Sequence, residues 1–298
     1  MKKRKSRILV LFLAVLLVSV MSCENPFLKK MLVEEEKGKT VPEKPHAPFV
    51  EGGASLILSP DKLTIKVKAV TSDGSAVAVE GCTETTLASS NSTYTVLHAK
   101  GTVVILKGNI IELNFYNNQL TALNVQGLSA LKKLFCHYNQ LTALNVQGLT
   151  ALKELYCGIN QLTAIDVQGR TALKRLWCNH NQLTELNVQG LTALQELWCN
   201  HNQLTELNVQ GLTALKELDC CNNQLNADAF KKLFDDLPAR AEGNNAECVL
   251  YTEKAGVTEG NHTDFTTPQD LKDAFDNAKH NKKWKMYKRD GSWPGVEI

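Results

Sequence analysis

Nine cysteines are the residues of this chain best suited to chemistry, and five of them recur at intervals of 21 residues. In an exported protein this number suggests disulfides, and zinc would need several of the thiolates to converge on one point. A regular repeat instead sets equivalent residues in a line, about 4.8 Å apart on adjacent strands. We therefore predict a ladder of buried, reduced thiols packed as small apolar side chains, with disulfides between adjacent rungs and metal binding as the alternatives. The ladder consists of Cys136, Cys157, Cys178, Cys199 and Cys220.

Three histidines are the other candidates for metal chemistry. His180 and His201 are 21 residues apart, so they share a position on adjacent units, and His137 is nearby. No third ligand accompanies them, which favours solvated histidines at an edge over a zinc pair. The sequence contains no G-x-S-x-G, H-E-x-x-H or P-loop motif. We expect no catalytic residue, no metal and no cofactor.

The central sequence is a tandem repeat with a constant period of 21 residues. Its phrase Asn-Gln-Leu-Thr recurs or nearly recurs with its glutamine at Gln119, Gln140, Gln161, Gln182, Gln203 and Gln224. A period of this length indicates stacked supersecondary units, each of which contacts only its neighbours. One unit cannot bury enough apolar surface to fold alone, so both ends of the array need caps.

Within one unit the spacing is L-x-x-L-x-C-x-x-N-x-L, set by Leu131, Leu134, Cys136, Asn139 and Leu141. This is the spacing of a leucine-rich repeat. It predicts an α/β-type solenoid with a parallel β-sheet on its concave face and a mostly irregular convex side. The repeated asparagine offers a donor and an acceptor, which would satisfy backbone groups in the turn after the strand.

Because side chains alternate along a strand, an inward Leu134 and Cys136 place Phe135 and His137 on the concave face. The position of Phe135 is aromatic in four consecutive units. Next to it the units carry charged residues. We interpret these outward positions as a ligand-binding surface; the alternative is that the rings stack only for stability. The predicted binding residues are Phe135, Tyr156, Trp177, Trp198, Glu154, Arg175 and Glu196.

The first residues resemble an export signal that ends in a lipidation site. A basic leader precedes the apolar run Ile8–Val20, which is too short to span a bilayer but typical of a signal peptide. The run ends in Val20-Met21-Ser22-Cys23, which resembles the lipobox of bacterial lipoproteins and predicts acylation of Cys23. An ordinary signal peptide with an incidental cysteine is the alternative. Glu24 follows, where an Asp would retain many Gram-negative lipoproteins at the inner membrane.

The chain therefore divides into five expected parts. Residues 1–22 form the signal peptide, 23–53 a lipidated, disordered tether, 54–109 a β-rich N-terminal cap, 110–225 the repeats and 226–298 an α+β C-terminal cap. In the N-terminal cap, alternating strands around Ser72-Asp-Gly74 predict a hairpin. In the C-terminal cap, two helices and two strands predict a degenerate continuation of the solenoid; a separate enzyme or receptor domain is the alternative.

Residues 110–225 resemble bacterial leucine-rich-repeat surface proteins, most closely the cysteine-ladder internalins, whose 21-residue repeats carry a cysteine at the same position. The resemblance implies a curved solenoid that is displayed at the cell surface and binds host or neighbouring-cell ligands. Two features depart from that family. A β-rich cap and a lipobox replace the helical cap and the cell-wall sorting tail, and Leu149 stands where an asparagine is common.

These observations predict a bacterial outer-membrane lipoprotein that is exposed at the surface and binds a protein or glycan on another cell or matrix, without catalysis and as a monomer. It would contact the membrane through its lipid anchor only. Five of the 33 basic residues lie in the leader, so the remaining chain has three more acidic than basic residues, which argues against nucleic acid. The rivals are a periplasmic scaffold without an external ligand and an enzyme carried by residues 226–298.

Overall fold

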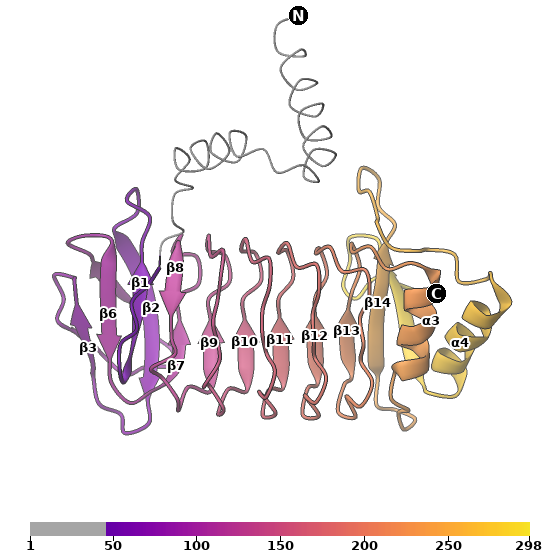
Figure 1. Ribbon diagram of the computed structural model, residues 1–298, viewed down its shortest axis with the longest axis horizontal. Coiled ribbons are helices and arrows are strands. Elements are labelled where there is room, and N and C mark those ends of the chain that lie inside the picture. Colours follow the sequence, from indigo (N-terminus) through magenta and orange to yellow (C-terminus); the bar gives the residue numbers. More distant parts are fainter. Residues whose placement is uncertain (1–45) are drawn as a thin grey trace, which may run out of the picture. The chain divides into compact units, whose positions relative to one another are not determined.

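The computed structural model describes residues 46–298. The predicted signal peptide, the lipidated Cys23 and the tether up to residue 45 lie outside the described residues. The described part is an elongated stack in which strands of successive units lie side by side (Figure 1). Two sheets build it, one of five strands at the N-terminal end and one of 11 strands that runs from the N-terminal cap to the C-terminal cap.

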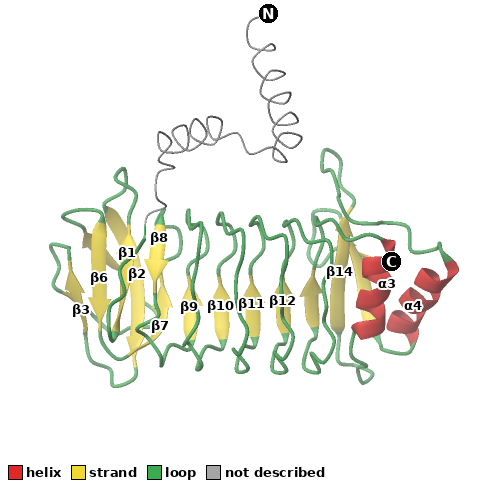
Figure 2. Cartoon of the chain, viewed as in Figure 1, coloured by secondary structure: helices red, strands yellow, loops and turns green. Residues whose placement is uncertain are grey.

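The central strands are short and parallel, and each comes from one repeat. Leu134, Leu155, Leu176 and Leu197 are paired with one another across the strands and are fully buried. The residues between β7 and β13 form strands, turns and irregular segments without a helix (Figure 2). The parallel sheet and the irregular opposite side are therefore confirmed. The strands are β7 (Ile110–Asn114), β9 (Lys133–Phe135), β10 (Glu154–Tyr156), β11 (Arg175–Trp177), β12 (Glu196–Trp198) and β13 (Glu217–Asp219).

The repeated asparagine satisfies the backbone at the turn after each strand. In Asn202, Nδ2 donates to the carbonyls of Cys199 at 3.0 Å and Cys178 at 3.1 Å, and Oδ1 accepts from the amide of Leu183 at 3.0 Å. Each asparagine thus bonds its own coil and the preceding one. The same contacts recur at Asn139, Asn160, Asn181 and Asn223.

At each end of this asparagine ladder, a residue of the cap supplies the hydrogen-bond partner that a further coil would supply. Asn118 bonds the amide and the carbonyl of Lys66 in the N-terminal cap at 2.9 and 2.8 Å. Asn261 accepts from the amide of Leu225 at 2.9 Å and donates to the carbonyls of Cys220 and Leu250. Asn261 starts a glycosylation sequon, but only 6% of its surface is exposed. Its role in the structure is that of the next ladder asparagine.

The N-terminal cap is a β-sandwich that shares one of its sheets with the repeats. Its five-stranded sheet has the order β4-β3-β6-β1-β8, while β5 and β2 extend the long sheet beyond β7. The last strand, β8, belongs to the first repeat, so the boundary at residue 109 does not separate cap from array. The strands are β1 (Gly53–Ile57), β2 (Thr64–Thr71), β3 (Val77–Glu80), β4 (Thr86–Leu87), β5 (Thr95–His98), β6 (Val103–Lys107) and β8 (Ala122–Asn124).

The hairpin predicted around Ser72-Asp-Gly74 is wrong. The two strands on either side of this turn form but belong to different sheets, since β2 pairs with β5 and β7 whereas β3 pairs with β4 and β6. The turn is held instead by Asn109: its Nδ2 donates to Asp73 at 2.8 Å, and its carbonyl accepts from the amide of Ser72. The turn residues specify a reversal, but burial on both sheets decides which strands pair.

The prediction of a disordered tether also fails for its last residues. Ala47 is only 5% exposed, and its carbonyl accepts from Nδ2 of Asn124 at 3.2 Å. Val50 lies so close to Gly127 that a Cβ there would be 1.9 Å from the Val50 carbonyl oxygen. Residues 46–52 are therefore part of the cap, and Gly127 makes that approach possible.

The C-terminal region continues the solenoid, as predicted. The strands β14 (Ala246–Thr252) and β15 (Trp284–Arg289) add to β13 in parallel, and β16 (Val296–Glu297) closes the edge antiparallel. Each of these two parallel strands follows a helix: β14 follows α3 (Ala227–Asp236), and β15 follows α4 (Gln269–His280). Phe230, Leu233 and Phe234 of α3 are fully buried and join the core of the coils. Among residues 46–298, no helix has the length and hydropathy to cross a bilayer.

One coil places a charge where its neighbours place leucine. Arg170 is 9% exposed at the position of Leu149 and Leu191, and its Nη1 donates to the carbonyl of Val146 at 2.7 Å. Its buried Nε has no hydrogen-bond partner. We expect Arg170→Leu to raise the free energy of unfolding by about 1–2 kcal/mol, because it removes a buried charge and an unsatisfied donor.

Urea unfolding measures that change. Arg175→Leu serves as the control, because Arg175 lies on the concave face with ion-pair partners and its loss should not stabilise the fold. Equal or lower stability of Arg170→Leu would mean that the arginine contributes net stability at this position.

Candidate functional site

The register of the parallel strands arranges the outward side chains in three parallel columns. The aromatic column contains Asn114, Phe135, Tyr156, Trp177, Trp198 and Asp219, and continues to Val249 and Tyr287 in the cap. The charged column contains Glu112, Lys133, Glu154, Arg175, Glu196 and Glu217, and continues to Glu247 and Lys285. The polar column lies just past the strands and contains Tyr116, His137, Gly158, Asn179, Asn200 and Cys221.

The four predicted aromatic residues form one continuous stack. Phe135 and Tyr156 lie parallel with ring centres 4.5 Å apart, and Trp177 and Trp198 lie parallel at 3.9 Å. Between the two pairs Tyr156 meets Trp177 edge-on at 4.6 Å. The rings are less exposed than the sequence predicts, since Tyr156 is 8% exposed and the other three are partly buried. Each ring covers the next one, so stacking and an accessible outer edge coexist.

A fifth ring, which the sequence did not predict, extends this stack from the C-terminal tail. The ring of Trp293 lies 4.7 Å from that of Trp198 and is 51% exposed. The guanidinium of Arg289 lies 5.0 Å from the centre of the Trp293 ring. Asp219 stands at the next position of the aromatic column, where the preceding units carry an aromatic residue. In the sequence, this change was the only sign that a ring from another segment lies here.

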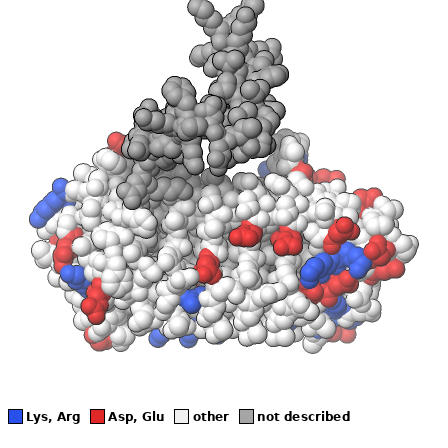
Figure 3. Space-filling model, viewed as in Figure 1, with Lys and Arg blue, Asp and Glu red and all other residues white. Residues whose placement is uncertain are grey.

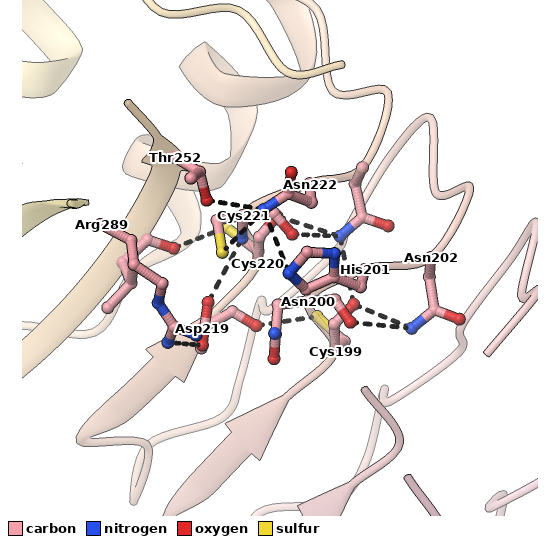
Figure 4. Close-up of polar contacts among 12 residues, drawn as sticks. Cys199, Asn200, His201, Asn202, Asp219, Cys220, Cys221, Asn222, Thr252 and Arg289 are labelled. Atoms are coloured by element: carbon pink, nitrogen blue, oxygen red, sulfur yellow. Dashed lines mark hydrogen bonds and ion pairs between the residues drawn. The ribbon is translucent and has the colours of Figure 1, made fainter. Parts of the chain in front are cut away.

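Arg289 attaches the tail to the last repeat through Asp219. Its Nη2 forms an ion pair with Oδ2 of Asp219, whose side chain is 1% exposed (Figure 4). Burial raises the pKa of Asp219 to about 6, although Arg289 opposes this shift. In the same close-up Asn222 donates to Thr252 at 2.6 Å and contacts Nε2 of His201. These contacts bind the cap to the concave face.

Several buried polar atoms of the concave face have no hydrogen-bond partner within the protein. They are Nε1 of Trp177, Nε1 of Trp198, Nδ1 of His137, Oδ1 of Asn200 and Nε of Arg289. Among the described residues only Arg170 and Arg240 add to this list from elsewhere. Phenylalanine would stack without leaving a donor unpaired, so a purely structural stack does not account for two tryptophans here.

The charged column forms a continuous series of ion pairs over its first five positions. Lys133 lies 3.4 Å from Glu112 and 3.8 Å from Glu154. Arg175 bonds Glu154 at 3.2 Å and Glu196 at 2.8 Å. The predicted residues Glu154, Arg175 and Glu196 are thus brought together, and the single arginine bridges the two glutamates. Burial, and then the nearby Glu196, raise the pKa of Glu217, the next carboxylate.

The ladder cysteines are buried, and their thiols are free in this structure. All five have no exposed surface, and the eight cysteines of the described residues are unpaired. Burial raises the pKa of Cys136 and Cys178 to about 12, so these thiols stay protonated at neutral pH. Cys221 follows the ladder on the concave side, and it is completely buried together with Val249 and Tyr287 of the cap.

The histidines do not form a metal site in the described residues. His180 and His201 stack with ring centres 4.0 Å apart, and His180 is exposed, as predicted. Burial and the adjacent His180 lower the pKa of His201 to about 4, which keeps it neutral at physiological pH. Residues 46–298 contain no group of three or more His, Cys, Asp or Glu side chains that could hold a metal.

The two histidines of the C-terminal region, His262 and His280, each contact a carbonyl of their own segment. His262 contacts the carbonyl of Asp264, and Nδ1 of His280 lies 2.9 Å from the carbonyl of Asp276. Both contacts are local to their own segments.

Charged side chains of both signs gather over the end that carries α3 and α4, whereas they are sparse over the middle coils on the face shown (Figure 3).

A family model described as leucine-rich repeats in two copies matches residues 171–211 and 192–234. The repeats are leucine-rich repeats. The matched residues cover the last coils and the start of the C-terminal cap. The array extends back to β7, because the earlier coils have the same in-register strands, buried leucines and bonded asparagines. No curated protein matches the chain.

Solved structures that contain leucine-rich repeats are similar to part of the chain. The functional domain of InlJ from Listeria monocytogenes, which includes a cysteine ladder, is 32% identical over 46% of this chain and 30% of its own, with a TM-score of 0.39. An internalin, inlF, of the same species is 21% identical over 48% and 43%, with a TM-score of 0.40. A Leptospira interrogans leucine-rich-repeat protein is 25% identical over 54% and 44%, with a TM-score of 0.38. The chain spans less than half the length of each.

Proposed function

We propose that this protein is a lipid-anchored surface protein of the bacterial envelope whose leucine-rich-repeat concave face binds another macromolecule, a protein or a glycan, without catalysis. The observation that carries the proposal is the contrast between the two sides of each strand. The inward residues are nearly invariant from coil to coil, whereas the outward columns vary and hold a continuous stack of large aromatic rings. Large, rigid aromatic side chains are the usual anchors of interfaces.

The C-terminal region supports the binding role over the enzyme rival. Its two parallel strands and helices extend the sheet and bury the last coil, and its tryptophan joins the aromatic stack. The region therefore completes the concave face. The protein is expected to act as a monomer, because cap strands cover both ends of the array.

The central test removes the aromatic anchors. We expect Trp177→Ala or Trp198→Ala to weaken binding of the ligand by about 2 kcal/mol or more, because each removes a large, rigid contact surface from the centre of the face. The ligand is first found by screening the full-length protein in detergent against matrix proteins and glycans, and affinity is then measured for each variant.

Glu185→Ala on the exposed convex side is the matched control and should bind as the wild type does. The melting temperature distinguishes the rival explanation. If both tryptophan variants melt earlier but bind with unchanged affinity, the aromatic stack serves stability only.

Anchoring is tested separately through Cys23. We expect Cys23→Ser to move the protein from the detergent phase to the aqueous phase in phase partitioning, since acyl chains are the proposed link to the lipid. Unchanged partitioning would contradict the lipid anchor. Protease treatment of intact cells then separates surface display, in which the protein is cleaved, from the periplasmic scaffold, in which it is protected.

A further inference from the structure

The alternation of charge in the charged column stops at its C-terminal end. Lys133 lies between Glu112 and Glu154, and Arg175 lies between Glu154 and Glu196. The next two positions are both acidic, Glu217 and Glu247, and neither forms an ion pair within residues 46–298. Lys285 follows in register, but its Nζ contacts Oδ1 of Asn245 at 3.2 Å. The earlier glutamates are separated by a strand that carries Lys133 or Arg175, whereas Glu217 and Glu247 lie on adjacent strands and form no ion pair among the described residues.

A recess lies at this point of the concave face. It is lined by Trp198, Glu217, Leu218, Glu247, Val249 and Trp293, and with these side chains in place it is too shallow to hold a water molecule. Two indoles and two carboxylates therefore border one small space with an apolar floor. Indole faces attract cations, and they do so more strongly when the site is partly shielded from water.

We propose that this recess binds the side chain of an arginine that a protein partner presents. The proposal rests on the proposed function and narrows it to a partner with a basic segment. An arginine placed over the carboxylates of Glu217 and Glu247 would supply the cation that this end of the charged column lacks. Its planar guanidinium would stack on the indole of Trp293 once that ring has moved away from Trp198. Adjacent strands are about 4.8 Å apart, so one guanidinium reaches carboxylates on both.

Two arginines of the protein itself already make the two kinds of contact proposed here, one with glutamates and one with an indole ring. The guanidinium of Arg175 bonds glutamates on its two neighbouring strands, and that of Arg289 lies over the ring of Trp293. Both of these cations are already occupied, Arg175 by Glu154 and Glu196 and Arg289 by Asp219. The carboxylates of Glu217 and Glu247 are the ones left to attract a partner.

Arginine suits the recess better than lysine. Its guanidinium is flat, stacks on aromatic rings and offers several donors in a fixed plane, whereas the ammonium of lysine is a compact, strongly hydrated charge. The recess is narrow, but Trp293 lies on the segment between β15 and β16 and is half exposed. Its ring can move outward without breaking a strand pair.

The test measures binding of an acetylated hexa-arginine peptide to the full-length protein in detergent by fluorescence anisotropy, with hexalysine and hexaglutamate peptides for comparison. We expect hexa-arginine to bind most tightly, and Glu217→Gln together with Glu247→Gln to weaken it roughly tenfold or more. Trp293→Ala should reduce the ratio between the affinities for hexa-arginine and for hexalysine. Glutamine keeps the size of each side chain, and an unchanged melting temperature confirms that the variant is folded.

The control is Glu185→Gln with Glu206→Gln, which removes the same charge from exposed positions outside the concave face and should leave peptide binding unchanged. Equal binding by the Glu217/Glu247 variant and the wild type, or an equal loss in the control, would overturn the inference. If Trp177→Ala abolishes binding of the natural ligand while the glutamine pair does not affect it, the concave-face function stands and the arginine site is wrong.

Discussion

Asn202→Ala should lower the free energy of unfolding by about 2–4 kcal/mol, although it removes only a small side chain. The amide of Leu183 loses its partner inside the coil, where water cannot replace it. The carbonyls of Cys178 and Cys199 each lose one of two asparagine donors and keep the other, from Asn181 and Asn223. Each buried polar group left unsatisfied costs about 1–3 kcal/mol. The loss extends to the neighbouring coil, because two of the three groups belong to the preceding repeat.

Urea unfolding followed by circular dichroism measures this effect, and Asn187→Ala is the matched control. Asn187 is exposed, and its side chain accepts only from the amide of Gln189 at 3.1 Å. Its loss should cost about 1 kcal/mol or less. If the two alanine variants were equally stable, the asparagine ladder would not be what satisfies the turns.

Cys178→Asp should prevent the central coils from folding at neutral pH. The thiol of Cys178 is fully buried in the apolar core and flanked by the ladder thiols of the adjacent coils. An ionised carboxylate there would cost at least several kcal/mol. Cys178→Ala, which removes volume without adding charge, should cost about 1–2 kcal/mol.

The pH dependence separates the charge from the loss of packing. Burial would raise the pKa of the new carboxyl in the folded state above its unfolded value of about 3.9. The variant would therefore keep its stability below that value and lose it as the pH rises. Cys178→Ala should show no such additional dependence. Rapid labelling of Cys157, Cys178 and Cys199 by a thiol reagent in the native wild type would contradict the inward assignment of the ladder.

The repeat determines how much of this fold could be predicted from sequence. A constant step of 21 residues puts every equivalent residue in register, so the inward cysteines, the outward aromatic column and the charged column follow from one strand assignment. The same reasoning fails where the period ends. The turn at Asp73 predicts a reversal, but the choice between two sheets depends on contacts with Asn109 and with distant strands.

The parts of the site that sequence reasoning missed all come from the tail. Trp293 is 95 residues from Trp198 in the sequence, yet it lies against that ring. Asn261 takes the next place in the asparagine ladder after an insertion that carries α3 and β14. Neither residue keeps the 21-residue step, so only the folded chain shows that they belong to the array.

The constant register of the coils has a consequence for how such a protein can change over generations. Nearly identical coding units in tandem favour unequal recombination, which adds or removes whole units. Loss of the unit 171–191 would join two coils whose leucines, cysteines and asparagines match, so the scaffold would survive. Glu154 would then lie beside Glu196, and Tyr156 beside Trp198. A single genetic event would thus rewrite the order of rings and charges that a partner meets, while the architecture that displays them stays the same.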